Sequence, residues 1–113
     1  MGIQSWDLVA GRPVILYLQA PKEKVWGILV GLTPAGIVVR GLDLVVFDDW
    51  MRQEARGEEV GLGLSTLFYP MSRLERMERD ETLGPLLSYA DRFLQEVGRT
   101  VFDAAGLEPE PER

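Results

Sequence analysis

The chain has 113 residues, 46% of them hydrophobic, and contains neither cysteine nor histidine. This length fits one domain with a single core, and the missing residue types exclude disulfides, thiolate metal sites and the usual general base. The net charge of −6 lies mostly in residues 80–113, which leaves the first 79 residues nearly neutral. We expect neither a membrane span nor a secretory signal, and therefore a cytoplasmic protein.

The N-terminal residues predict a short helix that leads into a strand. Ser5 precedes the segment WDLVA and Gly11 follows it, so the serine caps the helix and the glycine ends it. In the next segment, RPVILYLQA, successive side chains alternate between the two faces of a predicted strand. Pro13 lies at the first position of this strand, where a missing N–H costs least. The polar residues PKEK then form a turn.

Two β-rich runs, residues 25–32 and 37–47, are joined by the turn sequence TPAG. Gly27, Gly31 and Gly41 interrupt these runs at positions where a strand bends sharply or carries a bulge. Bent strands rich in glycine and valine are typical of a small, highly curved barrel. A plain β-hairpin in any antiparallel sheet is the alternative.

A helical insertion is predicted near residues 48–57. Asp48 or Asp49 can cap a helix over residues 50–56, and Gly57 can end it. We expect Trp50, which lies on this insertion, to face a subunit or partner surface. The acidic pairs at 48–49 and 58–59 lack the spaced ligands of a calcium loop, so we expect no metal site there.

Two further strands, residues 62–69 and 73–78, flank the tight connection PMS. Five strands with mostly short links favour a closed or nearly closed antiparallel barrel over residues 1–79. Residues 107–113 form a charged, proline-broken tail that we expect to be disordered.

Residues 80–106 are predicted to carry one long amphipathic helix of the same domain, opened by Pro85. Its apolar stripe can finish the core of its own barrel. Alternatively, the stripe can dock on a neighbouring subunit or another protein through Phe93, Val97 and Val101.

Three segments together resemble the Sm-like family, which includes the archaeal and eukaryotic Sm-like proteins and bacterial Hfq. They are SWDLVAGRPVILYL, VWGILVGLTPAGIVVRG and STLFYPMSRLERM, and they cover about residues 5–79. The resemblance implies a five-stranded barrel that joins strands four and five of neighbouring subunits into a homo-oligomeric ring. Rings of this family bind RNA at the inner face through residues of two inter-strand loops.

The RNA-contacting positions of the family are only partly matched. The first hairpin turn usually carries an acid shortly before an asparagine, but here it reads TPAG. The second motif carries Arg-Gly or Lys-His, and here it reads MSR. Arg73, Tyr69 as a stacking platform and Ser72 are therefore the candidate contacts to single-stranded RNA. In the structural alternative, Arg73 pairs with Glu75 or Glu78 and Tyr69 packs in the barrel wall.

We therefore expect a non-enzymatic Sm-like barrel that forms homo-oligomers through its edge strands and acts as an assembly or protein-binding module. No catalytic residue and no cofactor is predicted. The alternative function is an RNA-binding ring of the Sm/Hfq type, which the resemblance and the nearly neutral barrel region both favour.

Overall fold

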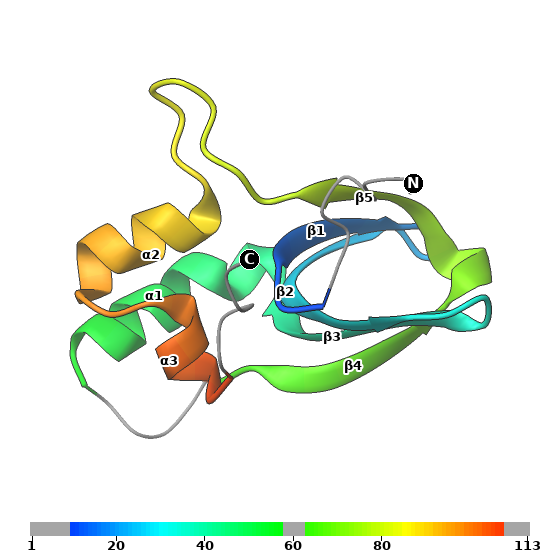
Figure 1. Cartoon of the computed structure of the whole chain (residues 1–113), viewed down its shortest axis with the longest axis horizontal. Helices are drawn as coiled ribbons and strands as arrows, with labels where there is room; N and C mark the ends of the chain where they lie inside the picture. Colours follow the sequence, from blue (N-terminus) through cyan, green and yellow to red (C-terminus); the bar gives the residue numbers. More distant parts are fainter. Residues whose placement is uncertain (1–9, 58–62, 108–113) are drawn as a thin grey trace, which may run out of the picture.

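The computed structural model describes residues 10–57 and 63–107 (Figure 1). Within these residues five antiparallel strands form a single sheet, which confirms the predicted mainly β architecture. The strands are β1 (Pro13–Leu18), β2 (Glu23–Leu32), β3 (Gly36–Asp43), β4 (Ser65–Pro70) and β5 (Leu74–Arg79). The helix expected after Ser5, the acids at 58–59 and most of the expected tail lie outside the described residues.

The strand order is β4-β3-β2-β1-β5, so β4 and β5 form the two edges of the sheet. Among the described strands these two do not pair with each other, so the sheet is open and closure of the predicted barrel is not seen. Figure 1 shows the sheet curling, with β4 and β5 on opposite sides of the central strands. The chain passes from β4 to β5 through a short 3-10 turn, η3 (Met71–Arg73).

The predicted irregularities lie in the β2–β3 hairpin. The pairing register shifts between Leu29 and Gly31, which confirms the bulge expected in this strand. Gly41 lies opposite Gly27, and a Cβ added to Gly41 would lie 2.1 Å from the carbonyl oxygen of Trp26. Only glycine therefore allows β2 and β3 to approach this closely.

The third strand is shorter than predicted. It ends at Asp43, and a 3-10 turn, η2 (Leu44–Val46), leads directly into helix α1 (Phe47–Ala55). The expectation that Asp48 or Asp49 caps this helix is wrong. Val46 occupies the cap position without a side-chain hydrogen bond, and both aspartates lie in the first turn. There their negative charges face the positive end of the helix dipole.

The prediction of a single long C-terminal helix is also wrong. The structure has two short helices, α2 (Tyr89–Val97) and α3 (Val101–Ala105). Gly98 ends α2 with a left-handed φ of +89°, which an L-residue adopts only at a cost. Thr100 then caps α3, because its hydroxyl accepts a hydrogen bond from the Asp103 amide at 3.1 Å.

The three helices gather at one end of the molecule, beside the sheet (Figure 1). Among the described residues, no helix combines the length and the apolar character needed to cross a membrane.

Two hydrophobic clusters lie on the two faces of the sheet. One face, here called the outer face, packs Ile15, Trp26 and Ile28 against the helices. The inner face holds a separate cluster built from β1, β2 and β3. Both edge strands add side chains to that inner cluster, which are Leu67, Tyr69, Leu74 and Met77.

Candidate functional site

The turn between β4 and β5 is tied to both neighbouring hairpins. The Met71 amide donates to the Ala35 carbonyl at 3.0 Å, which joins the turn to the β2–β3 connection. On the other side, the Gln19 amide donates to the Arg73 carbonyl at 2.9 Å, and its side chain donates to the Ser72 carbonyl at 3.3 Å. Residues far apart in the sequence therefore form one hydrogen-bonded rim.

Arg73 is engaged within this rim. Its Nε donates to the Gln19 carbonyl at 3.0 Å, and its Nη2 donates to the Pro21 carbonyl at 2.7 Å. Nη2 also lies 3.7 Å from a carboxylate oxygen of Glu23, and the guanidinium stands 5.9 Å from the Tyr69 ring centroid. The guanidinium thus clamps the β1–β2 turn. Its ion-pair partner is Glu23 of β2 rather than the predicted Glu75 or Glu78 of β5.

Tyr69 and Arg73 are brought together, as the sequence predicts. Tyr69 is half-buried and packs on the inner cluster, while Ser72 is exposed. Burial raises the pKa of the Tyr69 phenol above its ordinary value of 10.0, and the charges of Glu23 and Asp43 add to this effect. The phenol is therefore held neutral in the wall of the curled sheet.

The residues expected to face a partner lie in the chain's own core. Trp50 is 1% exposed and stacks on Phe93, with ring centroids 4.7 Å apart. Val101 is buried and Val97 is half-buried, both in the same outer-face cluster. The apolar stripe therefore packs in cis, because the break at Gly98 folds α3 back onto the sheet.

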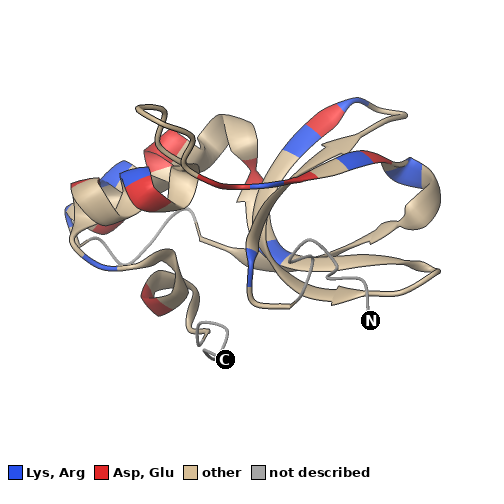
Figure 2. Cartoon of the chain, turned by 45° about the horizontal axis from the view of Figure 1, so that its top comes forward, with Lys and Arg blue, Asp and Glu red and all other residues tan. Residues whose placement is uncertain are grey.

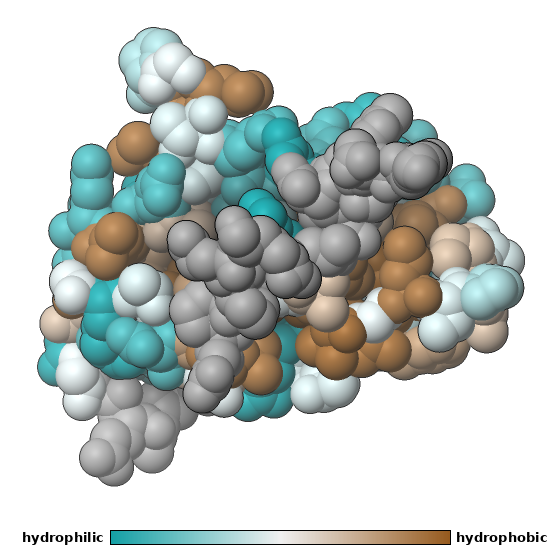
Figure 3. All heavy atoms as spheres, viewed as in Figure 1, coloured by the Kyte–Doolittle hydropathy of each residue, from teal (hydrophilic) through white to brown (hydrophobic). Residues whose placement is uncertain are grey.

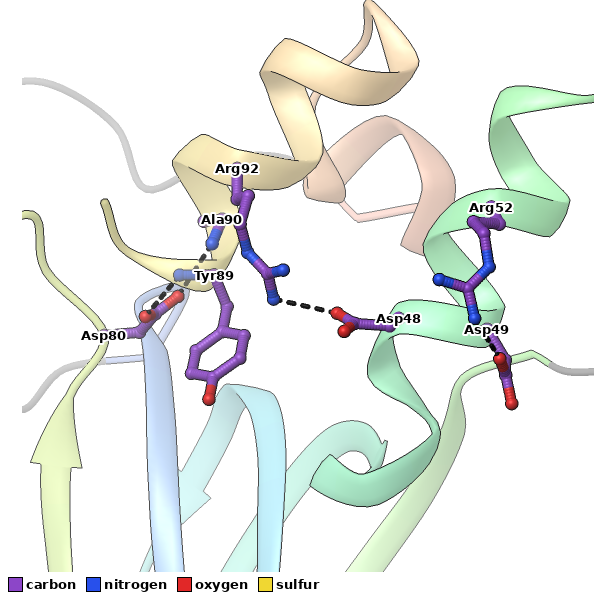
Figure 4. Close-up of polar contacts among 7 residues, drawn as sticks. All are labelled: Asp48, Asp49, Arg52, Asp80, Tyr89, Ala90 and Arg92. Carbon is purple, nitrogen blue, oxygen red and sulfur yellow. Dashed lines mark hydrogen bonds and ion pairs between the residues drawn. The ribbon is translucent and has the colours of Figure 1, made fainter. Parts of the chain in front are cut away.

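The paired acids of α1 form local ion pairs (Figure 4). Asp48 pairs with Arg92 of α2 at 2.9 Å, and Asp49 pairs with Arg52 one turn along its own helix. In the described ranges 10–57 and 63–107, no three acidic side chains gather in a way that could hold a metal ion.

The free edge of β4 presents backbone N–H and C=O groups, and the strand has no charged side chain. The sequence of the strand is STLFYP. In an antiparallel pair, every second residue of a strand directs its N–H and C=O groups to the neighbouring strand, and the residues between direct theirs away from it. The hydrogen bond from the Met71 amide to Ala35 shows which residues of β4 bond to β3 and which do not. By this alternation Thr66 and Phe68 present those groups at the free edge. The Phe68 side chain, on the outer face, is 55% exposed.

The edge formed by β5 differs in charge and regularity. The strand reads LERMER, and its register with β1 shifts where Tyr17 and Leu18 face Arg76 and Leu74. The charged side chains pair locally, for example Arg76 with Glu78 at 3.2 Å. Figure 2 shows alternating blue and red along β5, whereas most of β4 is tan. A bulge, charges and proline limit uncontrolled pairing at an edge. Of these β4 has only Pro70, at its end, so the rest of β4 is less protected than β5.

Beyond β5 the chain makes an excursion that the sequence reading missed, here called the leucine arm (residues 81–88). Leu83 and Leu86 exchange two backbone hydrogen bonds, at 2.9 and 3.0 Å, around a Gly84-Pro85 turn. The Ser88 amide donates to Thr82 Oγ1 at 2.9 Å and closes the base. Pro85 therefore lies in a turn rather than at a helix start, and the Gly-Pro dipeptide was the available signal.

Asp80 anchors the base of this arm. Its Oδ2 accepts from the Ala90 amide at 2.9 Å and its Oδ1 from the Tyr89 amide at 2.8 Å (Figure 4). Oδ2 also accepts from Trp26 Nε1 at 2.9 Å. One carboxylate thus joins β2, the arm and the start of α2. The arm is held in a fixed position relative to the sheet.

Comparison with known proteins gives no match: no family model matches the chain, and no curated protein or solved structure is significantly similar to it. The function is therefore inferred from the geometry of the chain together with the resemblance in its sequence.

Proposed function

We propose that this chain is a non-enzymatic, Sm-like module that assembles with copies of itself through the backbone edges of β4 and β5 and acts as an assembly or protein-binding unit. The observation that carries the proposal is the sheet order. The two strands that the Sm-like resemblance predicts at subunit contacts are the two edge strands of this sheet. Edge strands with unpaired backbone groups are templates for pairing with another chain.

The packing of the inner face supports an Sm-like curvature. Leu67 and Tyr69 from one edge and Leu74 and Met77 from the other pack against the same buried cluster. Both edges thus contribute to one cluster, and the sheet curls around it (Figure 1). A rolled sheet that remains open between β4 and β5 keeps two edges available for neighbouring subunits.

RNA binding receives less support than assembly. The Nε and Nη2 donors of Arg73 are used by two backbone carbonyls, and Tyr69 packs on the inner cluster. A base or phosphate would have to compete with these contacts. Fluorescence anisotropy with oligo-U and oligo-A, at low and at physiological salt, measures this directly. Salt-sensitive binding that falls in Arg73→Ala would favour the RNA ring over the assembly module.

The assembly proposal is tested by blocking one edge without disturbing the ladder inside the sheet. Thr66→Pro removes an N–H that points away from β3, so the monomer keeps its own strand pairing. Thr66→Val is the matched control, because it leaves the backbone donor in place and is equally suited to a strand. Size-exclusion chromatography with light scattering then reports the mass of each variant.

We expect oligomers for the wild type and Thr66→Val, and a smaller species for Thr66→Pro with an unchanged far-UV circular dichroism spectrum. A wild-type chain that stays monomeric at every concentration would contradict the proposal. Equal oligomer masses for Thr66→Pro and Thr66→Val would show that this edge takes no part in the contact.

A further inference from the structure

The leucine arm exposes apolar side chains on a rigid support. Leu83 is 61% exposed and Leu86 is 71% exposed, and Leu87 beside them is also exposed. In Figure 1 the arm projects away from both the sheet and the helices, and Figure 3 shows hydrophobic atoms on it. Its turn and base are closed by backbone and side-chain hydrogen bonds. Exposed leucines on a preorganised support are typical of a contact surface rather than of a loose loop.

A groove lies between this arm and the β5 edge. Its volume is about 1280 Å³, and its apolar lining includes Ile15, Leu83, Leu86 and Leu87. Ile15 belongs to the outer-face cluster, so the groove opens on the outer face of the sheet. The rim carries charges of both signs, among them Glu78, Glu81 and Arg92.

The opposite edge of the same sheet offers a complementary feature. Phe68 of β4 alternates with Leu67 and Tyr69, which face inward, so its ring lies on the outer face. The ring stands over Gly36, where an added Cβ would lie 2.5 Å from a Phe68 ring atom. Val38, the partner of Phe68 in the ladder, is half-buried beside it. Figure 3 shows hydrophobic atoms gathered over the β3–β4 side of the molecule.

We propose that the groove under the leucine arm receives the Phe68 side chain of a second copy of this chain. The inference rests on the proposed assembly and adds the side-chain contact that selects one edge for the other. When β4 of one copy lies beside β5 of the next with the outer faces continuous, Phe68 falls on the side of the arm.

The charges support a second copy as the occupant. β4 has no charged side chain, so it sets no like charge against the mixed rim of the groove. Two β5 edges meeting each other would instead bring together the strand sequence LERMER twice, with its bulge. The contact joins different surfaces of the two copies, and such head-to-tail contacts build rings or filaments.

The absence of cysteine from the sequence makes cross-linking a direct test. Phe68→Cys and Leu86→Cys are made as separate variants, mixed at a concentration where the wild type is assembled, and treated with a short bismaleimide. Peptide mass spectrometry identifies the linked residues. Val45→Cys is the matched control for Leu86→Cys, since Val45 is an exposed apolar residue (85%) that does not line this groove.

We expect a 68–86 cross-link between copies and none, or far less, from position 45 to 68. Leu83→Ser combined with Leu86→Ser should weaken assembly about tenfold, because these leucines then lose apolar contact area. Cross-links of 68 to 68 alone, or sedimenting oligomers without any 68–86 link, would overturn the arm contact while leaving assembly in place. A wild-type chain that is only monomeric would overturn both proposals.

Discussion

The Asp80 carboxylate joins the sheet to α2, so replacing it is expected to destabilise the whole domain. In Asp80→Ala the amides of Tyr89 and Ala90 lose their acceptor at the start of the helix. The indole N–H of Trp26 also loses its acceptor, and the Trp26 side chain is 0% exposed. The variant therefore leaves two first-turn amides of α2 without their side-chain acceptor and a buried indole donor without a partner, while Ser88 still caps the helix.

The size of the effect follows from these two losses. Removing a side chain that accepts hydrogen bonds from the first amides of a helix costs about 1 kcal/mol, and leaving a buried donor unpaired costs about 1–3 kcal/mol. The free energy of unfolding should fall by about 3 kcal/mol in total, which lowers the Tm of a domain of this size by roughly 10 °C or more.

Urea unfolding followed by tryptophan fluorescence measures this change, because Trp26 and Trp50 are buried in the folded chain. Glu81→Ala is the control at the adjacent acid, whose ion pair with Arg79 joins partly exposed side chains. It should cost less than about 1 kcal/mol. If Asp80→Ala cost no more than Glu81→Ala, the anchoring role of Asp80 would be refuted.

Four further substitutions test the packing and the titration of Tyr69. Gly41→Ala should lower the free energy of unfolding by about 2 kcal/mol or more, because the new methyl would lie 2.1 Å from the Trp26 carbonyl oxygen. Gly31→Ala is the control: its methyl meets nothing within 4 Å, so the urea midpoint should stay nearly unchanged. Trp50→Ala should cost about 3–5 kcal/mol, and a midpoint near that of the wild type would argue against its burial. The raised pKa of Tyr69 means that the unfolded phenol ionises first as the pH passes 10.0, so stability is lost above this pH. Between about pH 8 and about pH 11, the free energy of unfolding should fall less in Tyr69→Phe than in the wild type. An equal fall in both proteins would contradict the raised pKa.

The strands could be predicted because their signals are local. Alternating apolar residues, Pro13 at a strand start and the glycines of the β2–β3 hairpin all act within a few residues of the structure that they produce. The prediction for the C-terminal region was wrong because it also relied on a local signal. Apolar residues at helical spacing run across Gly98 without interruption, but the left-handed φ of that glycine and the extended backbone of Thr100 divide α2 from α3.

The candidate site depended on contacts between distant parts of the chain. The bonds from Arg73 to the carbonyls of Gln19 and Pro21 span more than fifty residues, so the sequence near Arg73 carries no sign of them. The burial of Trp50 likewise depends on Phe93 of another helix. The leucine arm had a local signal in its Gly-Pro turn, but the helical spacing of the following leucines obscured it.

The outward-facing amides of β4 test the assembly most directly. Residue-resolved hydrogen exchange should be followed by NMR at low and at high protein concentration. If β4 pairs with a second copy, the Thr66 and Phe68 amides become more protected as concentration rises, while the inward amides of Leu67 and Tyr69 are protected throughout. Exchange at Thr66 and Phe68 that stays fast and independent of concentration would contradict assembly through this edge.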